Sequence, residues 1–323
     1  MNKKDLRIVF MGTPDFAVES LRGLVENGYN IVGVITMPDK PSGRGHKIQY
    51  SAVKRYALEQ ALPLLQPEKL KDEEFLNALR ACNADLQIVV AFRMLPEVVW
   101  NMPRLGTFNL HGSLLPQYRG AAPINWAIIN GDKETGVTTF FLTHEIDTGK
   151  IILKEKVGIG EDDNAGKIHD ELMQVGAALV QKTVDLILED NVNTVAQEQL
   201  FADESELRPA PKIFKDTCRI DWAKPAKEIH NLIRGLSPYP TAWTELYMEE
   251  KEPQMVKIYA SEAILTENHL PAGSIRSDNK SYLHIACTGG YICIKEIQFA
   301  GKRAMRIDEV LRGYKFDEGA YFK

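Results

Sequence analysis

The sequence predicts an α/β domain followed by a smaller, β-rich domain, and three observations support this expectation. Short β-branched apolar runs alternate with amphipathic helical stripes as far as Leu188, the pattern of a mostly parallel sheet with helical crossovers. A polar segment with prolines at 209 and 211 then interrupts this pattern, and short alternating strands follow. The length of 323 residues also exceeds that of an ordinary domain. We therefore expect domains at residues 1–189 and 212–323, joined by a linker at 190–211.

The first domain is expected to be built from six strands and five helices. Apolar runs predict strands at residues 6–12, 31–35, 86–92, 107–111, 137–142 and 151–157. Apolar residues spaced three and four apart predict helices near residues 17–25, 51–61, 72–82, 122–129 and 168–186. Residues 37–49 are rich in proline, glycine and basic side chains, so we expect a loop there.

In the second domain one helix is expected at 226–236, and strands follow it. Residues 282–287 and 291–297 alternate across Thr288-Gly289-Gly290, which is typical of a hairpin. A small antiparallel domain, such as a barrel, fits this pattern better than further α/β units.

Composition excludes several classes of protein. Hydrophobic residues make up 44% and charged residues 26%, which excludes a collagen, a disordered tail and a disulfide-stabilised miniprotein. The formal net charge of −5 does not by itself indicate a nucleic-acid partner. The four cysteines lie far apart, and no apolar run approaches the ~18 residues of a membrane span. We therefore expect a cytoplasmic protein with reduced thiols.

The most informative segment is T-F-N-L-H-G-S-L-L-P-Q-Y-R-G at residues 107–120. Alternation places Asn109 and His111 on one face of a strand, near its carboxyl end, where α/β proteins bind ligands. Two buried polar residues in a hydrogen-bond network would give the same pattern. The loop that follows favours a functional site, because Leu114-Leu115-Pro116 could form an apolar wall suited to a flat ligand.

A carboxylate is the third candidate for this site. Asp147 lies in the segment E-I-D-T-G at 145–149, between an expected strand and a glycine. It could be an ordinary turn residue. If this turn returns to the strand that ends at His111, the carboxylate would instead orient the imidazole.

Other kinds of site find less support. The turn G-T-P-D-F at 12–16 lacks the G-x-G-x-x-G pattern of dinucleotide-binding folds. The seven histidines form no H-x-x-x-H pair and have no cysteine partner, so no metal site is expected. Residues 39–55 hold five basic side chains, which are either a solvated surface or part of a stripe that binds a phosphate backbone.

Together these motifs resemble the methionyl-tRNA formyltransferases, a group within the enzymes that take a formyl group from 10-formyltetrahydrofolate. The resemblance covers essentially the whole chain. It is carried by G-T-P-D-F at 12–16, P-S-G-R-G-H-K at 41–47, N-L-H-G-S-L-L-P-Q-Y-R-G-A-A-P at 109–123, G-D-K-E-T-G-V-T at 131–138, I-D-T-G at 146–149, R-I-D-W at 219–222 and L-I-R-G-L-S-P-Y-P-T-A-W at 232–243. The folate motifs define only the wider family, whereas the basic loop and the C-terminal domain favour the tRNA enzymes.

The resemblance implies a Rossmann-like formyltransferase domain followed by an OB-fold-like domain. It implies transfer of the formyl group of 10-formyltetrahydrofolate to the α-amino group of methionine on initiator methionyl-tRNA, for translation initiation. The implied catalytic residues are Asn109, His111 and Asp147. The implied folate-binding residues are Ser113, Leu114, Leu115 and Pro116. The residues implied to contact tRNA are Arg44, Lys212 and Lys215. We expect a monomer.

The chain departs from the family at one place, and three alternatives stay open. The family often has V-A-Y-G-x-x-L-P after its fourth strand, where this chain has the shorter V-A-F-R-M-L-P at 90–96. The alternatives are a formyltransferase of a purine precursor or an amino sugar, a pyridine-nucleotide dehydrogenase, and a noncatalytic RNA-binding protein. Tyr239, Trp243 and Tyr247 could stack on bases, but their spacing favours core positions.

Overall fold

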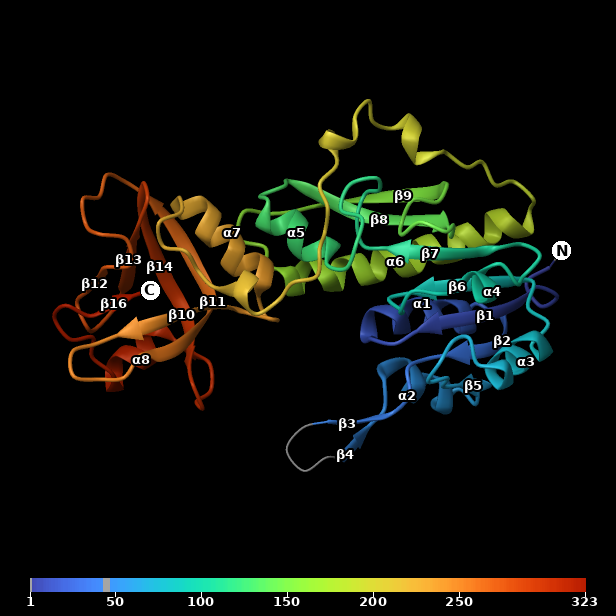
Figure 1. Cartoon of the computed structure of the whole chain (residues 1–323), viewed down its shortest axis with the longest axis horizontal. Coiled ribbons are helices and arrows are strands. Elements are labelled where there is room, and N and C mark those ends of the chain that lie inside the picture. The colour runs from blue at the N-terminus through green and yellow to red at the C-terminus, as the bar shows by residue number, and fades with distance from the viewer. Residues whose placement is uncertain (1, 43–46) are drawn as a thin grey trace. The chain divides into compact units, whose positions relative to one another are not determined.

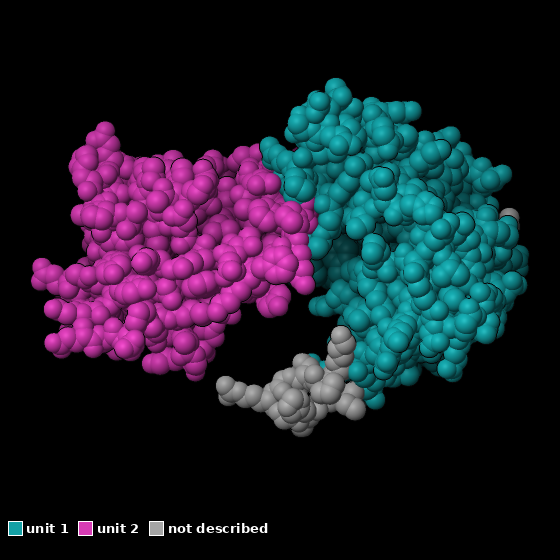
Figure 2. All heavy atoms as spheres, in the orientation of Figure 1, with its two compact units in different colours: residues 1–123, 135–157, 169–209 teal, residues 124–134, 158–168, 210–323 magenta. Residues whose placement is uncertain are grey.

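The computed structural model describes residues 2–42 and 47–323, which form two compact units. Figure 2 colours unit 1 (residues 1–123, 135–157 and 169–209) teal and unit 2 (residues 124–134, 158–168 and 210–323) magenta. Two short segments from the first half of the chain therefore belong to the same compact unit as the C-terminal residues.

Unit 1 is built on a mostly parallel sheet with the order β5-β2-β1-β6-β7-β8-β9 (Figure 1). Its strands are β1 (Arg7–Gly12), β2 (Asn30–Ile35), β5 (Leu64–Leu65), β6 (Leu86–Val90), β7 (Thr107–His111), β8 (Glu134–Phe141) and β9 (Ile151–Gly158). The pairs from β5 to β7 are parallel, and β7 and β8 are antiparallel. The strand order reverses between β1 and β6, and α/β proteins bind ligands beside such a reversal, at the carboxyl ends of the strands.

Six α-helices lie between residues 15 and 188 in the described part of the chain, and the apolar side chains of the third illustrate how such a helix packs on the sheet. The helices are α1 (Asp15–Glu26), α2 (Ala52–Glu59), α3 (Glu73–Ala81), α4 (Glu97–Trp100), α5 (Pro123–Ile129) and α6 (Ala165–Leu188). Leu76 and Leu79 of α3 pack in one cluster with Val9 and Met11 of β1. The side chain of Ser51 caps α2 by accepting the Lys54 N–H at 3.0 Å.

Helix α6 fixes which face of β7 is left for the candidate site. The Thr139 hydroxyl of β8 lies 2.8 Å from that of Thr183 on α6, and both side chains are buried. Thr139 is the cross-strand partner of Leu110. Since side chains alternate along a strand, Asn109 and His111 point to the opposite face from α6.

The antiparallel sheet of unit 2 is closed toward a barrel. Its order is β12-β13-β14-β11-β10-β16, with β15 paired to β14. The strands and α-helices of this unit from residue 226 onward are α7 (Ala226–Leu236), β10 (Ala242–Tyr247), β11 (Gln254–Leu265), β12 (Ile275–Ser277), β13 (Leu283–Cys287), β14 (Gly290–Phe299), β15 (Met305–Arg306), α8 (Ile307–Gly313) and β16 (Tyr321–Phe322). The Phe322 N–H donates to the Gly273 carbonyl at 2.9 Å and links the two edges. Gly273 has φ +86° and a Cβ there would lie 2.1 Å from the Phe322 oxygen, so glycine is required.

The expected fold class, a mostly parallel α/β domain followed by a β-rich domain, is confirmed. The strand at 107–111 and the helix at 226–236 have the predicted bounds. The expectation of a plain loop at 37–49 was incomplete, because β3 (Lys40–Ser42) and β4 (Lys47–Gln49) form a short antiparallel ladder. Its backbone pairs form without the alternating apolar side chains that reveal a strand in the sequence.

One other expectation needs correction. Tyr239 is 83% exposed and Tyr247 lies half-buried on the outer face of β10, so the prediction of core positions was wrong for these two residues. Trp243 is half-buried and packs against the core of unit 2. The segment 190–211 contains two short 3-10 turns, η1 (Gln197–Gln199) and η2 (Glu204–Glu206). None of the helices within residues 2–42 and 47–323 is long and apolar enough to cross a bilayer.

Candidate active site

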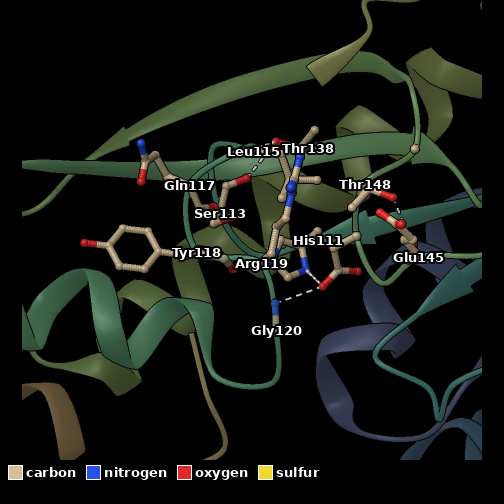
Figure 3. A network of polar contacts seen from close by, with 12 residues as sticks. His111, Ser113, Leu115, Gln117, Tyr118, Arg119, Gly120, Thr138, Glu145 and Thr148 are labelled. Carbon is tan, nitrogen blue, oxygen red and sulfur yellow. Dashed lines mark hydrogen bonds and ion pairs between the residues drawn. The ribbon is translucent and has the colours of Figure 1, made fainter. Parts of the chain in front are cut away.

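His111 ends β7, and its imidazole is held between two protein groups (Figure 3). The side chain is only 7% exposed. Nε2 lies 2.8 Å from the Tyr118 carbonyl oxygen, and Nδ1 lies 3.8 Å from Oδ2 of Asp147. Because a carbonyl oxygen can only accept, Nε2 carries a proton in this contact. Nδ1 is thus the ring nitrogen that faces the carboxylate, at a distance longer than a direct hydrogen bond.

Asp147 is both a turn residue and a partner of the imidazole. Its backbone has φ +56°, a left-handed conformation that aspartate tolerates better than most residues. Oδ2 accepts the Gly120 N–H at 2.9 Å, so the same oxygen that faces His111 is held by the loop after Tyr118 (Figure 3). The turn therefore does return to the end of β7, the condition on which the predicted orienting role depended.

Asn109 occupies the same face of β7 as His111 and is half-buried. Within the described part of the chain, its amide side chain has no hydrogen-bond partner. A carboxamide offers two donors and one acceptor, and it donates without changing charge. An unpaired amide beside an imidazole is suited to stabilise a developing oxyanion.

The loop that follows His111 is fixed by hydrogen bonds to β8 and β9. The Thr138 hydroxyl donates to the Ser113 carbonyl at 2.7 Å and accepts the Leu115 N–H at 3.1 Å. Lys154 Nζ donates to the Leu115 carbonyl at 3.0 Å. Burial, and secondarily the neighbouring charge of Lys156, lowers the pKa of Lys154.

The predicted apolar wall is mostly turned inward. Ser113 and Leu115 are fully buried, and Leu115 packs with Phe140 and Ile151. Pro116 is buried as well, whereas Leu114 is partly exposed. Of the folate-binding candidates at 113–116, Leu114 is therefore the one whose side chain is open to a ligand.

Sequence reasoning missed Gln197, which holds the Asp147 turn. Gln197 Nε2 donates to the carbonyls of Asp147 and Gly149, each at 2.8 Å. Its Oε1 accepts from Nε and Nη2 of Arg119, at 3.0 and 2.7 Å. Gln197 lies in the segment expected to be a linker, where no motif or periodicity singles it out.

The predicted basic residues fall into different environments. Arg44 lies outside the described residues. Lys54 is only 11% exposed on its side chain and pairs with Asp39 at 2.5 Å, so it does not belong to an open basic stripe. In unit 2, Lys212 Nζ lies 5.5 Å from the Phe214 ring, and Lys215 Nζ lies 5.5 Å from the Trp243 ring.

In the segment that departs from the family pattern, Arg93 anchors the chain. Its guanidinium donates to the carbonyls of Pro67 and, at 2.8 Å, of Glu68. Burial lowers the pKa of this arginine.

Among the described positions, no group of three or more histidine, cysteine, aspartate or glutamate residues is arranged to hold a metal ion.

Comparisons with known proteins identify the family of the chain. Residues 6–184 match the formyl transferase family, and residues 212–315 match the formyl transferase C-terminal domain. Methionyl-tRNA formyltransferase of Bacteroides thetaiotaomicron is 64% identical over 319 residues, which are 99% of each chain. Methionyl-tRNA formyltransferase of Porphyromonas gingivalis is 52% identical and covers 100% of each chain.

Solved structures share the fold at lower identity. WlaRD, a sugar 3N-formyl transferase, gives a TM-score of 0.63 at 20% identity and covers 92% of this chain and 99% of its own. HypX from Aquifex aeolicus in complex with tetrahydrofolic acid gives 0.64 at 17% identity over 97% of this chain and 48% of its own. The predicted resemblance is confirmed by the full-length relatives: this chain belongs to the methionyl-tRNA formyltransferase family.

Proposed function

We propose that this protein transfers the formyl group of 10-formyltetrahydrofolate to the α-amino group of methionine on initiator methionyl-tRNA, and so supplies the formylated initiator for translation. The observation that carries the proposal is the assembly at the end of β7, where the Asn109 amide lies on the same face of the strand as His111 and His111 faces Asp147. Relatives of 52–64% identity over the whole chain carry the name of this activity.

The proposed reaction is an attack of the amine nitrogen on the formyl carbon. A new C–N bond forms, and the carbonyl oxygen becomes an oxyanion. The intermediate collapses with cleavage of the bond to N10 of the folate, which leaves as tetrahydrofolate with the proton lost by the amine. Asn109 donates to the oxyanion, and removal of one such donor typically costs about 10²–10³ in rate. His111, through Nδ1, and Asp147 handle the proton.

Binding of the two substrates is proposed to use different parts of the chain. Residues 113–116 form the folate-binding loop, a role supported by the hydrogen bonds between its backbone and the side chains of Thr138 and Lys154. Arg44, Lys212 and Lys215 contact the tRNA. Support for the two lysines is that each lies against an aromatic ring in unit 2, an arrangement able to combine phosphate and base contacts.

We also propose that the chain consists of a formyltransferase domain at 1–189, a linker at 190–211 and a C-terminal domain at 212–323.

We further propose a cytoplasmic location and a monomeric state. The location is supported by the four cysteines, all of which are free thiols. Sedimentation equilibrium of the purified protein tests the monomer, and a mass twice that of the chain would contradict it.

The decisive experiment is formylation of methionyl-tRNA by the purified protein with 10-formyltetrahydrofolate, next to the same assay with small amines. We expect formylmethionyl-tRNA from the wild type. Asn109→Ala should lower kcat by at least about tenfold, with the Kd for tetrahydrofolate changed less than twofold. Asn101→Ala, an exposed asparagine at the end of α4, is the matched control. Formylation of small amines alone, or normal kcat in Asn109→Ala, would contradict the proposal.

A further inference from the structure

The segment from Val195 to Arg208, called the strap below, is bonded to the candidate site near both of its ends. Val195 exchanges two backbone hydrogen bonds with Ile151, at 2.8 and 2.9 Å. Farther along, the Gln117 side chain donates to the Glu206 carbonyl at 3.0 Å and accepts the Arg208 N–H at 2.8 Å. The Tyr118 N–H donates to the Arg208 carbonyl at 2.7 Å. The strap therefore contacts both the loop after His111 and the strand after Asp147.

Gln197 is the strap residue closest to the chemistry, and every polar group of its buried amide is used. Its two donors go to the carbonyls of Asp147 and Gly149, and its acceptor faces Arg119. A guanidinium can only donate and a carbonyl can only accept. The amide therefore has one possible orientation. A flipped amide would place its oxygen against the two carbonyl oxygens and its NH2 group against the two guanidinium N–H groups.

The turn that Gln197 holds also lies close to the end of β8. A Cβ at Gly149 would lie 1.6 Å from the Phe141 carbonyl oxygen, so the backbone there approaches β8 too closely for any residue but glycine. Gln197 bonds the carbonyl of the same glycine. Between these two contacts Asp147 keeps its left-handed conformation, and its Oδ2 stays on the Gly120 N–H and opposite His111.

We propose that Gln197 is a positioning residue for the catalytic aspartate: the segment that leads to the C-terminal residues completes the active site of unit 1 by holding the Asp147 turn. This inference rests on the proposed function, because it takes Asp147 as a participant in formyl transfer. Gln197 does not touch the reacting atoms in this account. Its effect passes through the two backbone carbonyls of the turn.

The test compares Gln197→Ala and Gln197→Glu with the control Gln199→Ala, an exposed glutamine of the same short 3-10 turn. Glutamate retains an acceptor for Arg119 but loses both donors to the turn. We expect kcat to fall at least about tenfold in both Gln197 variants. The Kd for tetrahydrofolate and the KM for tRNA should change less than twofold, and Gln199→Ala should match the wild type. Unchanged kcat in Gln197→Glu would overturn the inference.

A double-mutant cycle separates positioning from a general structural role. Because Gln197 acts through Asp147, Gln197→Ala should have no further effect on kcat in an Asp147→Asn background. Multiplied losses in the double variant would contradict this.

Amide hydrogen exchange gives a readout that does not depend on the substrate. Gln197→Ala should speed exchange of the Gly120 N–H, which Oδ2 of Asp147 accepts, and Gln199→Ala should not. Unchanged Gly120 exchange in Gln197→Ala defeats the positioning claim even if the wild type formylates a different amine. A wild type that fails to formylate methionyl-tRNA while this exchange effect holds defeats the proposed function alone.

Discussion

Thr138 offers the sharpest test of how the folate-binding loop is held. Its hydroxyl is fully buried and hydrogen-bonds two backbone groups of that loop, the Ser113 carbonyl and the Leu115 N–H. Valine has nearly the same shape and lacks the hydroxyl, so Thr138→Val removes both hydrogen bonds without opening a large cavity. A buried polar group left unpaired costs about 1–3 kcal/mol, and the two groups together cost about 2–6 kcal/mol if the loop stays in place.

In the free protein the loop can reduce this cost by moving so that water solvates the two backbone groups, but ligand binding then has to return the loop to its folded position. If one of the two groups remains unpaired in the bound state, the binding free energy weakens by about 1.4 kcal/mol, which is a tenfold loss of affinity. We therefore expect Thr138→Val to weaken tetrahydrofolate binding at least about tenfold, measured by isothermal titration calorimetry.

Thr139→Val is the matched control for this experiment. Thr139 is equally buried on the same strand, but its hydroxyl meets Thr183 of α6 on the opposite face. Thr183 still donates to the Leu179 carbonyl when this partner is lost. The control should lower the melting temperature and leave the folate Kd within twofold. Equal loss of affinity in both variants, or none in Thr138→Val, would refute the reasoning.

Two further predictions concern the buried His230 and the contacts that Lys54 makes beside the β3–β4 ladder. Burial lowers the pKa of His230 below its ordinary 6.5, so the unfolded chain binds this proton more readily and the folded chain loses stability as pH falls below about 6.5. His230→Asn should therefore show a smaller drop in melting temperature between pH 7.5 and 5.5 than the wild type, whereas the exposed control His269→Asn should show the full drop. Lys54 Nζ joins the residues on either side of the β3–β4 ladder, at 2.5 Å from Asp39 and 3.9 Å from the Tyr50 ring centre. Lys54→Met removes both contacts and should raise the KM for tRNA at unchanged folate Kd, and an unchanged KM would show that these contacts do not position the ladder.

The placement of Asn109 and His111 could be predicted from the sequence because it depends on local geometry alone. A strand has a period of two, so two polar residues separated by one apolar residue share a face whatever the rest of the fold does. The same holds for α7, whose bounds were predicted from its apolar spacing. Local periodicity is therefore sufficient to predict the bounds of these elements and the shared face of the two residues.

Asp147 could be predicted only conditionally, because its approach to His111 depends on a long-range pairing. The antiparallel register of β7 and β8, with His111 opposite Thr138, brings the chain back toward the end of β7. The φ of +56° then aims the carboxylate at the imidazole. Neither the register nor a left-handed aspartate is readable from residue types, since aspartate before glycine is common in ordinary turns.

Gln197 could not be predicted at all. A single glutamine in a polar segment has no periodicity, and its role arises from two backbone carbonyls 48 and 50 residues away and from one arginine 78 residues away. The polar composition of residues 190–211 predicts a linker, but it does not reveal the backbone and amide hydrogen bonds that this segment makes. Polar composition distinguishes a linker from a packed domain and does not distinguish a free linker from one bonded along a surface.

The extent of unit 2 also could not be predicted from local sequence patterns, because it depends on contacts between distant segments. The family match to the C-terminal domain begins at 212, yet α7 takes its hydrogen-bond partners from segments far earlier in the chain. Arg234 donates to the carbonyls of Gly160 and Asp163, at 3.0 and 2.9 Å, and Asn125 donates to the Gly235 carbonyl at 2.7 Å. Burial lowers the pKa of Arg234, so this cation is held where its solvation is poor and where those carbonyls replace water. Residues 124–134 and 158–168 therefore belong to the same compact unit as α7, and the start of that unit does not coincide with the family match that begins at 212.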